Sequence, residues 1–199
     1  MQNETMQTYA QIADTFLKVN NRPKRHAYEI GRFLSLLPTN SLILDVGCGP
    51  GYDAATFRQQ GYRAIATDLS LEMMQVGRGQ FGGSYLQADM CHLPFGPIFD
   101  ALWISASLLH LPKPNAIVAI AEFARLLKPN GILFMTVKEG DGDGMTKEAY
   151  GYPLRRYFNY WHSAELDGAL STNFTPVDGW RKVYPNGTQP WLVRFAQRK

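Results

Sequence analysis

The chain has 199 residues, of which 45% are hydrophobic and 19% charged, and a formal net charge of +3. This length and composition predict one globular domain with a substantial core and exclude a disordered chain. The small positive charge, mixed with acidic residues, does not require a nucleic-acid partner. Cys48 and Cys91 are the only cysteines, so we expect reduced thiols in a cytoplasmic protein. We also expect no signal peptide and no membrane-spanning segment.

Helical and strand patterns alternate along the chain, which predicts a three-layer α/β fold. Two helices are expected ahead of the sheet, at Thr8–Val19 and Lys24–Leu37, and Pro38 ends the second. The predicted strands are Leu42–Val46, Arg63–Thr67, Tyr85–Ala88, Ala101–Ser105 and Ile132–Val137. The helices predicted between them are Asp53–Gln60, Leu71–Arg78 and Asn115–Leu127.

The pattern changes after Gly140. The stretch Gly140–Gly144 predicts a flexible turn, and Tyr150–Trp161 is rich in aromatic residues and arginine. A short helix is expected from Ser163 to Leu170, with the serine as its cap. Two late strands, near Val177–Val183 and Trp191–Ala196, are expected to complete the sheet as an antiparallel pair.

The segment LILDVGCGPG, residues 42–51, is the most informative part of the chain. A predicted strand leads through Asp45 into a loop with glycines at alternate positions, Gly47, Gly49 and Gly51. Glycine adopts backbone angles that other residues avoid and leaves room for a ligand. Because such a loop connects a strand to a helix, it predicts a binding crevice at the carboxyl end of a parallel sheet.

Two kinds of ligand suit a loop of this type. A dinucleotide fingerprint needs a third glycine where this chain has Tyr52. The carboxylate of Asp45 would also repel a pyrophosphate, which disfavours a nicotinamide-dependent oxidoreductase. Asp68 ends the next predicted strand, where a carboxylate can accept hydrogen bonds from both hydroxyls of a ribose. The pattern therefore favours a ligand with a ribose and a positive charge but no phosphate, such as S-adenosylmethionine.

In its ordered motifs, the chain resembles the class I S-adenosylmethionine-dependent methyltransferases. The motifs are LILDVGCGPGYDAATF (42–57), AIATDLSLEMM (64–74), LQADMCHLPF (86–95), FDALWISASLLHLP (99–112) and LLKPNGILFMTVKEG (126–140). The resemblance implies a Rossmann-like fold with a mostly parallel seven-stranded sheet, an antiparallel last strand and helices on both faces. A single domain 1–199 is expected, with N-terminal helices at 1–38, a cofactor-binding core at 39–140 and a substrate-facing lid with the terminal strands at 141–199.

The resemblance also implies where the cofactor, and its product S-adenosylhomocysteine, would bind. Gly47 and Gly49 would lie against the methionine part, Asp68 would hold the ribose, and Asp89 and Met90 would border the adenine. The other expected cofactor-binding residues are Tyr9, Asp45, Cys48, Leu69, Met73 and Ser105.

Several of these acidic and aromatic residues have a structural alternative. Asp45 is equally suited to bond backbone amides of its own loop, and Asp89 to form an Asx turn. Tyr9 can instead pack on the edge of the sheet. For Asp53, capping of the helix that begins there is preferred to a binding role.

The acceptor side of the site is less clearly marked. His110 is a candidate general base, because imidazole titrates near neutral pH, or else it bonds a backbone carbonyl that closes its loop. The pair Arg155-Arg156 is interpreted as solvated, with binding of an acidic substrate as the alternative. An aromatic cluster is expected to form a lid, unless it forms a satellite core: Tyr150, Tyr152, Tyr157, Phe158, Tyr160 and Trp161. Of these, the residues expected to face the substrate are Tyr152, Tyr157, Tyr160 and Trp161.

The resulting hypothesis is metal-independent methyl transfer to a small molecule by in-line displacement, in which the protein mainly aligns the reactants. The stretch Ser105–Leu108 lacks the Asn/Asp-Pro-Pro-Tyr/Phe motif of enzymes that methylate base amino groups, and Ser105 supplies no acidic metal ligand. An inactive cofactor-binding regulator and a protein or RNA methyltransferase are the alternatives. The expected partner is the small-molecule acceptor, without a membrane or nucleic acid, and the protein is expected to be a monomer or homodimer.

Overall fold

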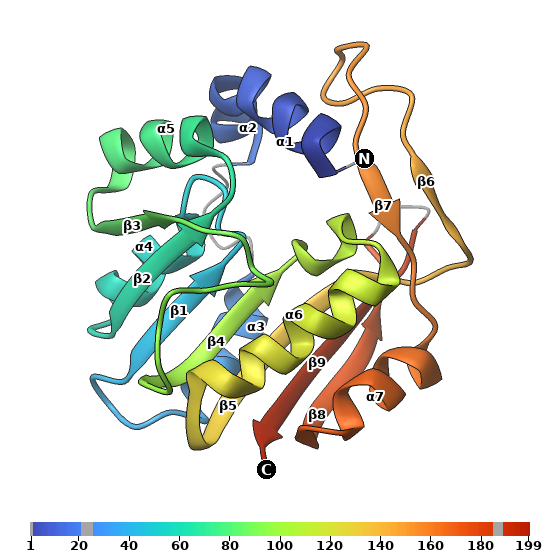
Figure 1. Cartoon of the computed structure of the whole chain (residues 1–199). Coiled ribbons are helices and arrows are strands. Elements are labelled where there is room, and N and C mark those ends of the chain that lie inside the picture. Colours follow the sequence, from blue (N-terminus) through green and yellow to red (C-terminus); the bar gives the residue numbers. More distant parts are fainter. Residues whose placement is uncertain (1, 21–25, 185–188) are drawn as a thin grey trace.

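The computed structural model describes residues 2–20, 26–184 and 189–199 and is built around a seven-stranded sheet (Figure 1). The strand order is β3-β2-β1-β4-β5-β9-β8. The strands are β1 (Leu42–Val46), β2 (Arg63–Asp68), β3 (Ser84–Gln87), β4 (Phe99–Ser105), β5 (Leu127–Lys138), β8 (Phe174–Lys182) and β9 (Trp191–Arg198). The pairs among β1 to β5 are parallel, whereas β9 is antiparallel to both β5 and β8. The expected Rossmann-like sheet with an antiparallel last strand is therefore confirmed.

Helices cover both faces of this sheet. They are α1 (Gln2–Gln11), α2 (Ala13–Asn20), α3 (Ala27–Leu34), α4 (Tyr52–Gln59), α5 (Leu71–Phe81), α6 (Lys113–Leu126) and α7 (Ser163–Ser171), with a 3₁₀ turn, η1, at Leu108–His110. Residues of α3 and α4 share one buried cluster with the sheet, and residues of α6 and α7 share the other. Figure 1 shows α1 and α2 lying across the carboxyl ends of the parallel strands. These two helices thus roof the edge where the sequence predicts a binding crevice.

An aromatic cluster fills the core beneath α3 and α4. The rings of Trp103 and Phe134 stack with centroids 3.7 Å apart, and Phe33 and Phe57 pack edge-on against Trp103. All four side chains are fully buried, and each such burial contributes about 1.5–3 kcal/mol. The indole N–H of Trp103 donates to Asp53 Oδ2 at 2.7 Å. The expected capping role of Asp53 is wrong, because α4 has Gly51 as its N-cap and the carboxylate instead satisfies a buried donor.

The glycine loop after β1 is held in place from two sides. Gly47 has φ of +66°, and a Cβ there would lie 2.3 Å from the Cβ of Ser107. On the other side, a Cβ at Gly77 in α5 would lie 1.9 Å from the carbonyl oxygen of Pro50. Helix α5 therefore packs directly on the loop backbone, and only a glycine fits at this contact.

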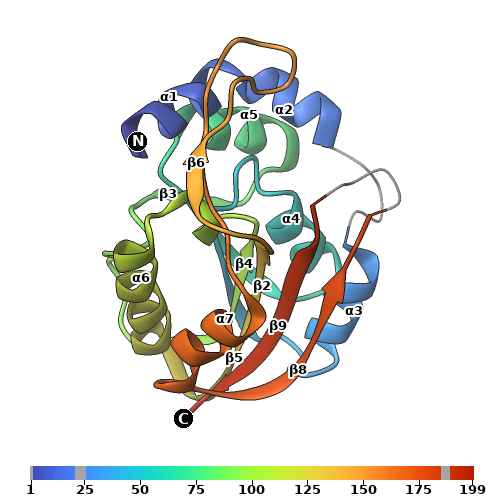
Figure 2. The ribbon, with the colours of Figure 1, turned by 90° about the vertical axis from the view of Figure 1, so that its right-hand side faces the viewer.

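The structure departs from the predicted elements at both ends of the chain. The helix expected at Thr8–Val19 is two helices, α1 and α2. The expected start of the next helix at Lys24 lies outside the described residues, and α3 begins at Ala27. The flexible turn expected at Gly140–Gly144 is partly wrong, because β6 (Asp143–Met145) pairs antiparallel with β7 (Tyr157–Asn159) as a small second sheet, visible in Figure 2.

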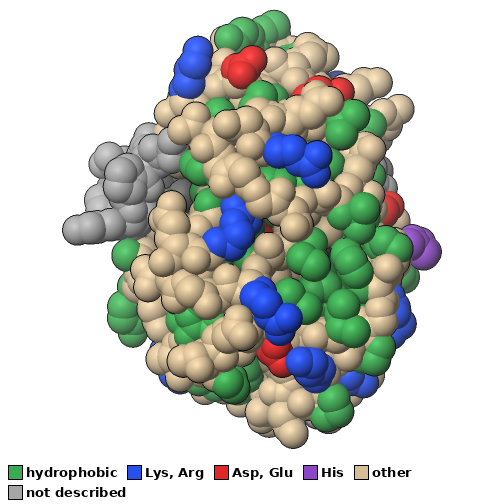
Figure 3. Space-filling view, turned by 90° about the vertical axis from the view of Figure 1, so that its left-hand side faces the viewer, with side chains coloured by type: hydrophobic (Ala, Val, Ile, Leu, Met, Phe, Trp, Pro, Cys, Tyr) green, Lys and Arg blue, Asp and Glu red, His purple; other side chains and the backbone are tan. Residues whose placement is uncertain are grey.

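The surface is mixed in character. Figure 3 shows basic side chains on one face in separate groups between hydrophobic and polar ones. Across the described part of the chain, the helices are too short or too polar for any of them to cross a membrane.

Candidate functional site

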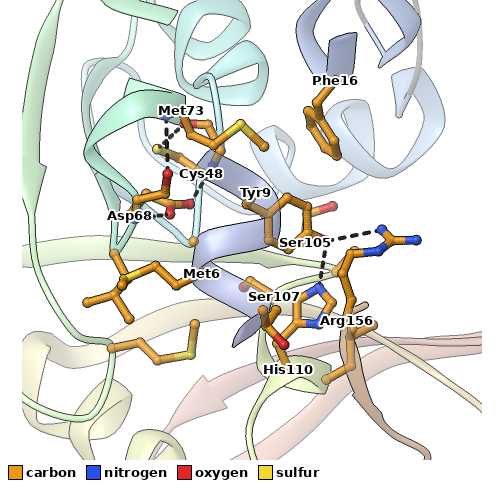
Figure 4. A pocket seen from close by; sticks show the side chains of 18 of the residues that line it. Met6, Tyr9, Phe16, Cys48, Asp68, Met73, Ser105, Ser107, His110 and Arg156 are labelled. Carbon is orange, nitrogen blue, oxygen red and sulfur yellow. Dashed lines mark hydrogen bonds between the residues drawn. The ribbon is translucent and has the colours of Figure 1, made fainter. Parts of the chain in front are cut away.

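A cavity of about 400 Å³ lies between the strand ends, the N-terminal helices and the segment that leads into β7. The cofactor-binding residues expected from the sequence all line it: Tyr9, Asp45, Gly47, Cys48, Gly49, Asp68, Leu69, Met73, Asp89, Met90 and Ser105. His110, the candidate base, lines it as well. Figure 4 shows Asp68, Cys48 and Met73 on one side, Arg156 and His110 on the other, and Tyr9 between them.

The carboxylate of Asp68 is fixed at the end of β2 by backbone donors. Its Oδ2 accepts from the N–H of Gly49 at 2.7 Å, and its Oδ1 accepts from the N–H of Ser70 at 2.9 Å. Burial raises the pKa of Asp68, while the backbone N–H groups oppose that shift. A carboxylate has about four acceptor positions, so acceptor capacity remains for hydroxyl donors of a ligand in the cavity.

Asp45 and Cys48 line the cavity on the same side as Asp68. Asp45 is 2% exposed, and its Oδ2 accepts from the N–H of Ala54 at 3.1 Å. Burial, and then the nearby charge of Asp53, raises the pKa of Asp45 well above its usual value. Burial also raises the pKa of the Cys48 thiol, so this cysteine is not a reactive thiolate. Asp45 thus anchors the first turn of α4 and faces the cavity at the same time.

Asp89 combines the two roles that the sequence left open. Its Oδ1 accepts from the N–H of Cys91 at 2.9 Å, which is an Asx turn. Asp89 nevertheless borders the cavity with Met90. The turn fixes the carboxylate, and Oδ1 and Oδ2 retain acceptor positions for an amino group.

A hydrogen-bonded chain forms the opposite wall. The Nδ1 of His110 lies 2.7 Å from the carbonyl oxygen of Tyr157, and its Nε2 lies 2.8 Å from the hydroxyl of Tyr9. Because a carbonyl only accepts, the proton of the neutral imidazole is on Nδ1, and Nε2 accepts from Tyr9. Arg156 donates to the Tyr9 oxygen at 3.3 Å. All the hydrogen-bonding groups of His110 are therefore engaged.

The ionisation of this wall follows from its burial. Burial, with the charges of Arg156 and Lys138 adding to it, lowers the pKa of His110 to about 4. Burial raises the pKa of Tyr9 to about 12, although Arg156 opposes that shift. At neutral pH both groups are uncharged. To act as a general base, His110 would have to release the Tyr9 hydroxyl from its Nε2.

The four residues expected to form a lid lie elsewhere. Tyr157 and Trp161 are 2% and 1% exposed and belong to the core, whereas Tyr152 is 46% exposed. The hydroxyl of Tyr157 donates to Asp143 at 2.6 Å, away from the cavity. Tyr160 is partly buried, and like the other three it is absent from the cavity lining within the described residues. Within the described residues, the cavity lining therefore does not include the four aromatic residues expected to face the substrate, Tyr152, Tyr157, Tyr160 and Trp161.

The segment before and within β7 supplies other side chains instead. Tyr150, Arg156 and Phe158 line the cavity. Side chains alternate between the two faces of an extended segment, so Arg156 and Phe158 share a face from which Tyr157 points away. Arg156, which the sequence predicts to be solvated, therefore lines the cavity, as does Lys138 at the end of β5, for which the sequence analysis makes no prediction. The alternation itself was the usable signal.

No group of three or more histidine, cysteine or acidic residues placed to hold a metal ion occurs within residues 2–20, 26–184 and 189–199.

Residues 44–135 match the protein family described as "Methyltransferase domain". The chain is 30% identical over 180 residues to a protein of Salmonella typhimurium named malonyl-[acyl-carrier protein] O-methyltransferase, covering 85% of this chain and 68% of that one. It is 38% identical over 104 residues to a protein of the same name from Buchnera aphidicola, covering 51% of this chain and 41% of that one. The chain thus spans between about two fifths and two thirds of the length of these curated relatives.

Among solved structures, the Burkholderia thailandensis 1,6-didemethyltoxoflavin-N1-methyltransferase, which contains its substrate and S-adenosylhomocysteine, superposes with a TM-score of 0.80 at 22% identity. The match covers 99% of this chain and 88% of that one. With the fold, the glycine loop and the similarity to the Salmonella protein together, the chain belongs to the class I S-adenosylmethionine-dependent methyltransferases.

Proposed function

We propose that this chain transfers the methyl group of S-adenosylmethionine to a small-molecule acceptor held in the same cavity, without a metal ion. The observation that carries the proposal is one cavity, which the expected cofactor residues other than Tyr9 line on one side and Tyr9, His110, Lys138 and Arg156 line on the other. One cavity with two chemically different halves suits a reaction between two bound molecules.

The residues of the cofactor half fit S-adenosylmethionine. Asp68 keeps acceptor positions for the two ribose hydroxyls, and the glycine loop leaves space where a Cβ would intrude. Asp89 offers an acceptor for the adenine amino group, and Met90 an apolar surface. When bound, the cofactor would supply a methyl group on a positively charged sulfur. Acidic side chains around this half, Asp45 and Asp68, suit that charge.

The protein's own contribution is alignment and exclusion of water. The aromatic side chains Tyr9, Phe16 and Phe158 border the cavity, and α1 and α2 cover it. Such a wall holds an acceptor against the cofactor half and removes water as a competing nucleophile. His110 would accept a proton only from an acceptor that carries one at working pH.

A second, more specific candidate for the acceptor is a malonyl group on an acyl-carrier protein. It is favoured by the similarity to the Salmonella protein, whose name gives that substrate and which aligns over 85% of this chain. This candidate differs from the first in requiring a protein that delivers the acceptor.

Titration calorimetry with S-adenosylmethionine and S-adenosylhomocysteine tests the proposal. We expect micromolar binding by the wild type and at least about tenfold weaker binding by Asp68→Ala, because each hydrogen bond to a charged acceptor contributes about 1.5–3 kcal/mol. Asp178→Ala is the matched control. Asp178 lies on β8, outside the cavity lining, and its carboxylate pairs with Arg32 of α3. Transfer of labelled methyl groups to an extract of small metabolites, with a chelator present, then follows. Absence of cofactor binding by the wild type would contradict the proposal.

A further inference from the structure

Two basic side chains of the cavity wall lack an acidic partner. Lys138 and Arg156 both line the cavity, and neither takes part in any ion pair found among residues 2–20, 26–184 and 189–199. The Nε of Arg156 is buried and has no hydrogen-bond partner within the described part of the chain. By contrast, the neighbouring Arg155 is exposed and pairs with Glu4. Two adjacent arginines thus have opposite environments.

Aromatic rings surround these two cations without satisfying their donors. Arg156 lies 5.1 Å from the ring centroid of Tyr150 and 5.2 Å from that of Phe158. The Nζ of Lys138 lies 4.1 Å from the Phe158 centroid. Ring faces attract a cation, but an ammonium and a guanidinium still offer N–H donors that a ring cannot fully satisfy.

The cost of this arrangement points to a missing anion. Burial, and then the charge of Arg156, lowers the pKa of Lys138, so the two cations destabilise each other. Partly buried charges are normally paired. Among the residues that the structure describes, the Tyr9 hydroxyl is the one polar group that bonds to either side chain, and it already donates to His110. An anion between Lys138 and Arg156 would satisfy both.

We propose that Lys138 and Arg156 form a subsite for a carboxylate of the acceptor, next to the position of methyl transfer. This rests on the proposed function, because it identifies the chemical class of the acceptor bound in the same cavity. A planar guanidinium holds a carboxylate through two parallel hydrogen bonds, and an ammonium adds a third donor. Tyr9, bonded to both Arg156 and His110, orients the guanidinium toward the cavity.

The location separates this subsite from the cofactor half. In Figure 4, Arg156 lies across the cavity from Asp68 and Met73, with Tyr9 between them. Lys138 is the last residue of β5, and Arg156 directly precedes β7, so neither side chain comes from the glycine loop or from the β2 end that holds Asp68. A carboxylate bound there would face the cationic sulfur of the cofactor, and the attraction between them would add to the alignment.

The test is titration of malonate, and of the neutral isostere malonamide, into protein saturated with S-adenosylhomocysteine. We expect saturable malonate binding and at least about fivefold weaker binding of malonamide. Arg156→Gln and Lys138→Gln should each weaken malonate binding at least about tenfold and leave the affinity for S-adenosylhomocysteine within twofold, which also reports that the variants fold. Arg156→Lys should retain part of the malonate affinity.

Two exposed cations serve as matched controls, Arg155→Gln and Lys147→Gln, which should change neither affinity. Equal binding of malonate and malonamide, or malonate binding that survives both cavity variants, would overturn the subsite. A loss of S-adenosylhomocysteine affinity in Arg156→Gln or Lys138→Gln would assign the cations to the cofactor and likewise overturn it. Failure of the wild type to bind S-adenosylhomocysteine at all is a different result, since it contradicts the proposed function rather than the subsite.

Discussion

The two halves of the cavity are built in different ways. The cofactor half comes from consecutive strand ends and loops between Asp45 and Ser105, held mainly by backbone groups such as the N–H of Gly49. The acceptor half is assembled from side chains of separate segments: Tyr9 in α1, His110 in η1, Lys138 at the end of β5, and Phe158 in β7. The first is encoded in contiguous motifs, whereas the second exists only once the chain has folded.

The halves also differ in charge. Carboxylates of Asp45, Asp68 and Asp89 face the cofactor half, whereas Lys138 and Arg156 face the acceptor half. A cationic cofactor and an anionic acceptor would each meet the opposite charge. Changes in one half should therefore leave ligand affinity in the other unaltered, and that separation can be tested.

The largest effect is expected where α5 packs on the glycine loop. Gly77→Ala places a Cβ 1.9 Å from the Pro50 carbonyl oxygen, so either the loop or the helix must move. We expect a loss of roughly 2–4 kcal/mol in the free energy of unfolding and loss of S-adenosylhomocysteine binding, measured by denaturant titration and calorimetry. Gly79→Ala in the same helix has open space around its Cβ and should be neutral or stabilise by up to about 1 kcal/mol. Equal behaviour of the two variants would refute the contact.

A smaller effect concerns the acid sensitivity of the acceptor half. The pKa of His110 is lowered to about 4, so the unfolded chain binds the extra proton first as the pH falls. The histidine's contribution to stability is present above about pH 6.5 and is lost as the pH falls toward 4, amounting to at most about 3 kcal/mol. We expect His110→Asn to flatten this part of the stability profile, measured by urea unfolding between neutral pH and pH 4. The exposed His162→Asn is the control, and an unchanged profile for His110→Asn would count against the buried neutral imidazole.

Removal of the Tyr9 hydroxyl should lower the affinity for a ligand in the acceptor half without changing the affinity for the cofactor product. Tyr9→Phe keeps the ring but leaves Nε2 of His110 and one N–H of Arg156 without their partner. A loss of about 1–2 kcal/mol in acceptor or malonate binding is expected, with S-adenosylhomocysteine affinity within twofold. The opposite pattern, in which cofactor affinity falls, would place the Tyr9 hydroxyl in the cofactor half as the family resemblance implies.

The smallest effect is expected at the former lid candidate Tyr152. Its side chain is 46% exposed, and its hydroxyl lies at a long 3.4 Å from the Thr15 hydroxyl. Tyr152→Ala should change stability by less than about 0.5 kcal/mol and leave methyl transfer within twofold. A marked loss of kcat/KM would restore Tyr152 to the lid.

These contrasts explain what the sequence could predict. The bounds of β1 coincide with the predicted strand Leu42–Val46, because a continuous apolar run and the following glycines are local signals. The expected cofactor residues other than Tyr9 could be named from the sequence because each lies within a few residues of a strand end. The requirement for glycine at position 77 could not be predicted from the sequence. It arises because the Pro50 carbonyl oxygen lies next to Gly77, and the two residues meet only in the folded protein.

The residues of the acceptor half could not be predicted from the local sequence pattern alone, because they come together only in the folded protein. Its wall depends on how β6 pairs with β7, which sets the face that Arg156 and Phe158 share. The aromatic cluster was expected as a whole to form a lid, and the two-residue period of an extended segment explains why Phe158 lines the cavity and Tyr157 does not. The partner of Tyr9, His110, lies 101 positions away in sequence.

The most direct test of the central claim is a crossed titration of two variants with two ligands. Asp68→Ala and Arg156→Gln are each titrated with S-adenosylhomocysteine and with malonate. We predict that Asp68→Ala loses S-adenosylhomocysteine affinity and keeps malonate affinity, and that Arg156→Gln does the reverse. If both variants lost both ligands, or if Arg156→Gln lost only S-adenosylhomocysteine, the cavity would not consist of separate cofactor and acceptor halves.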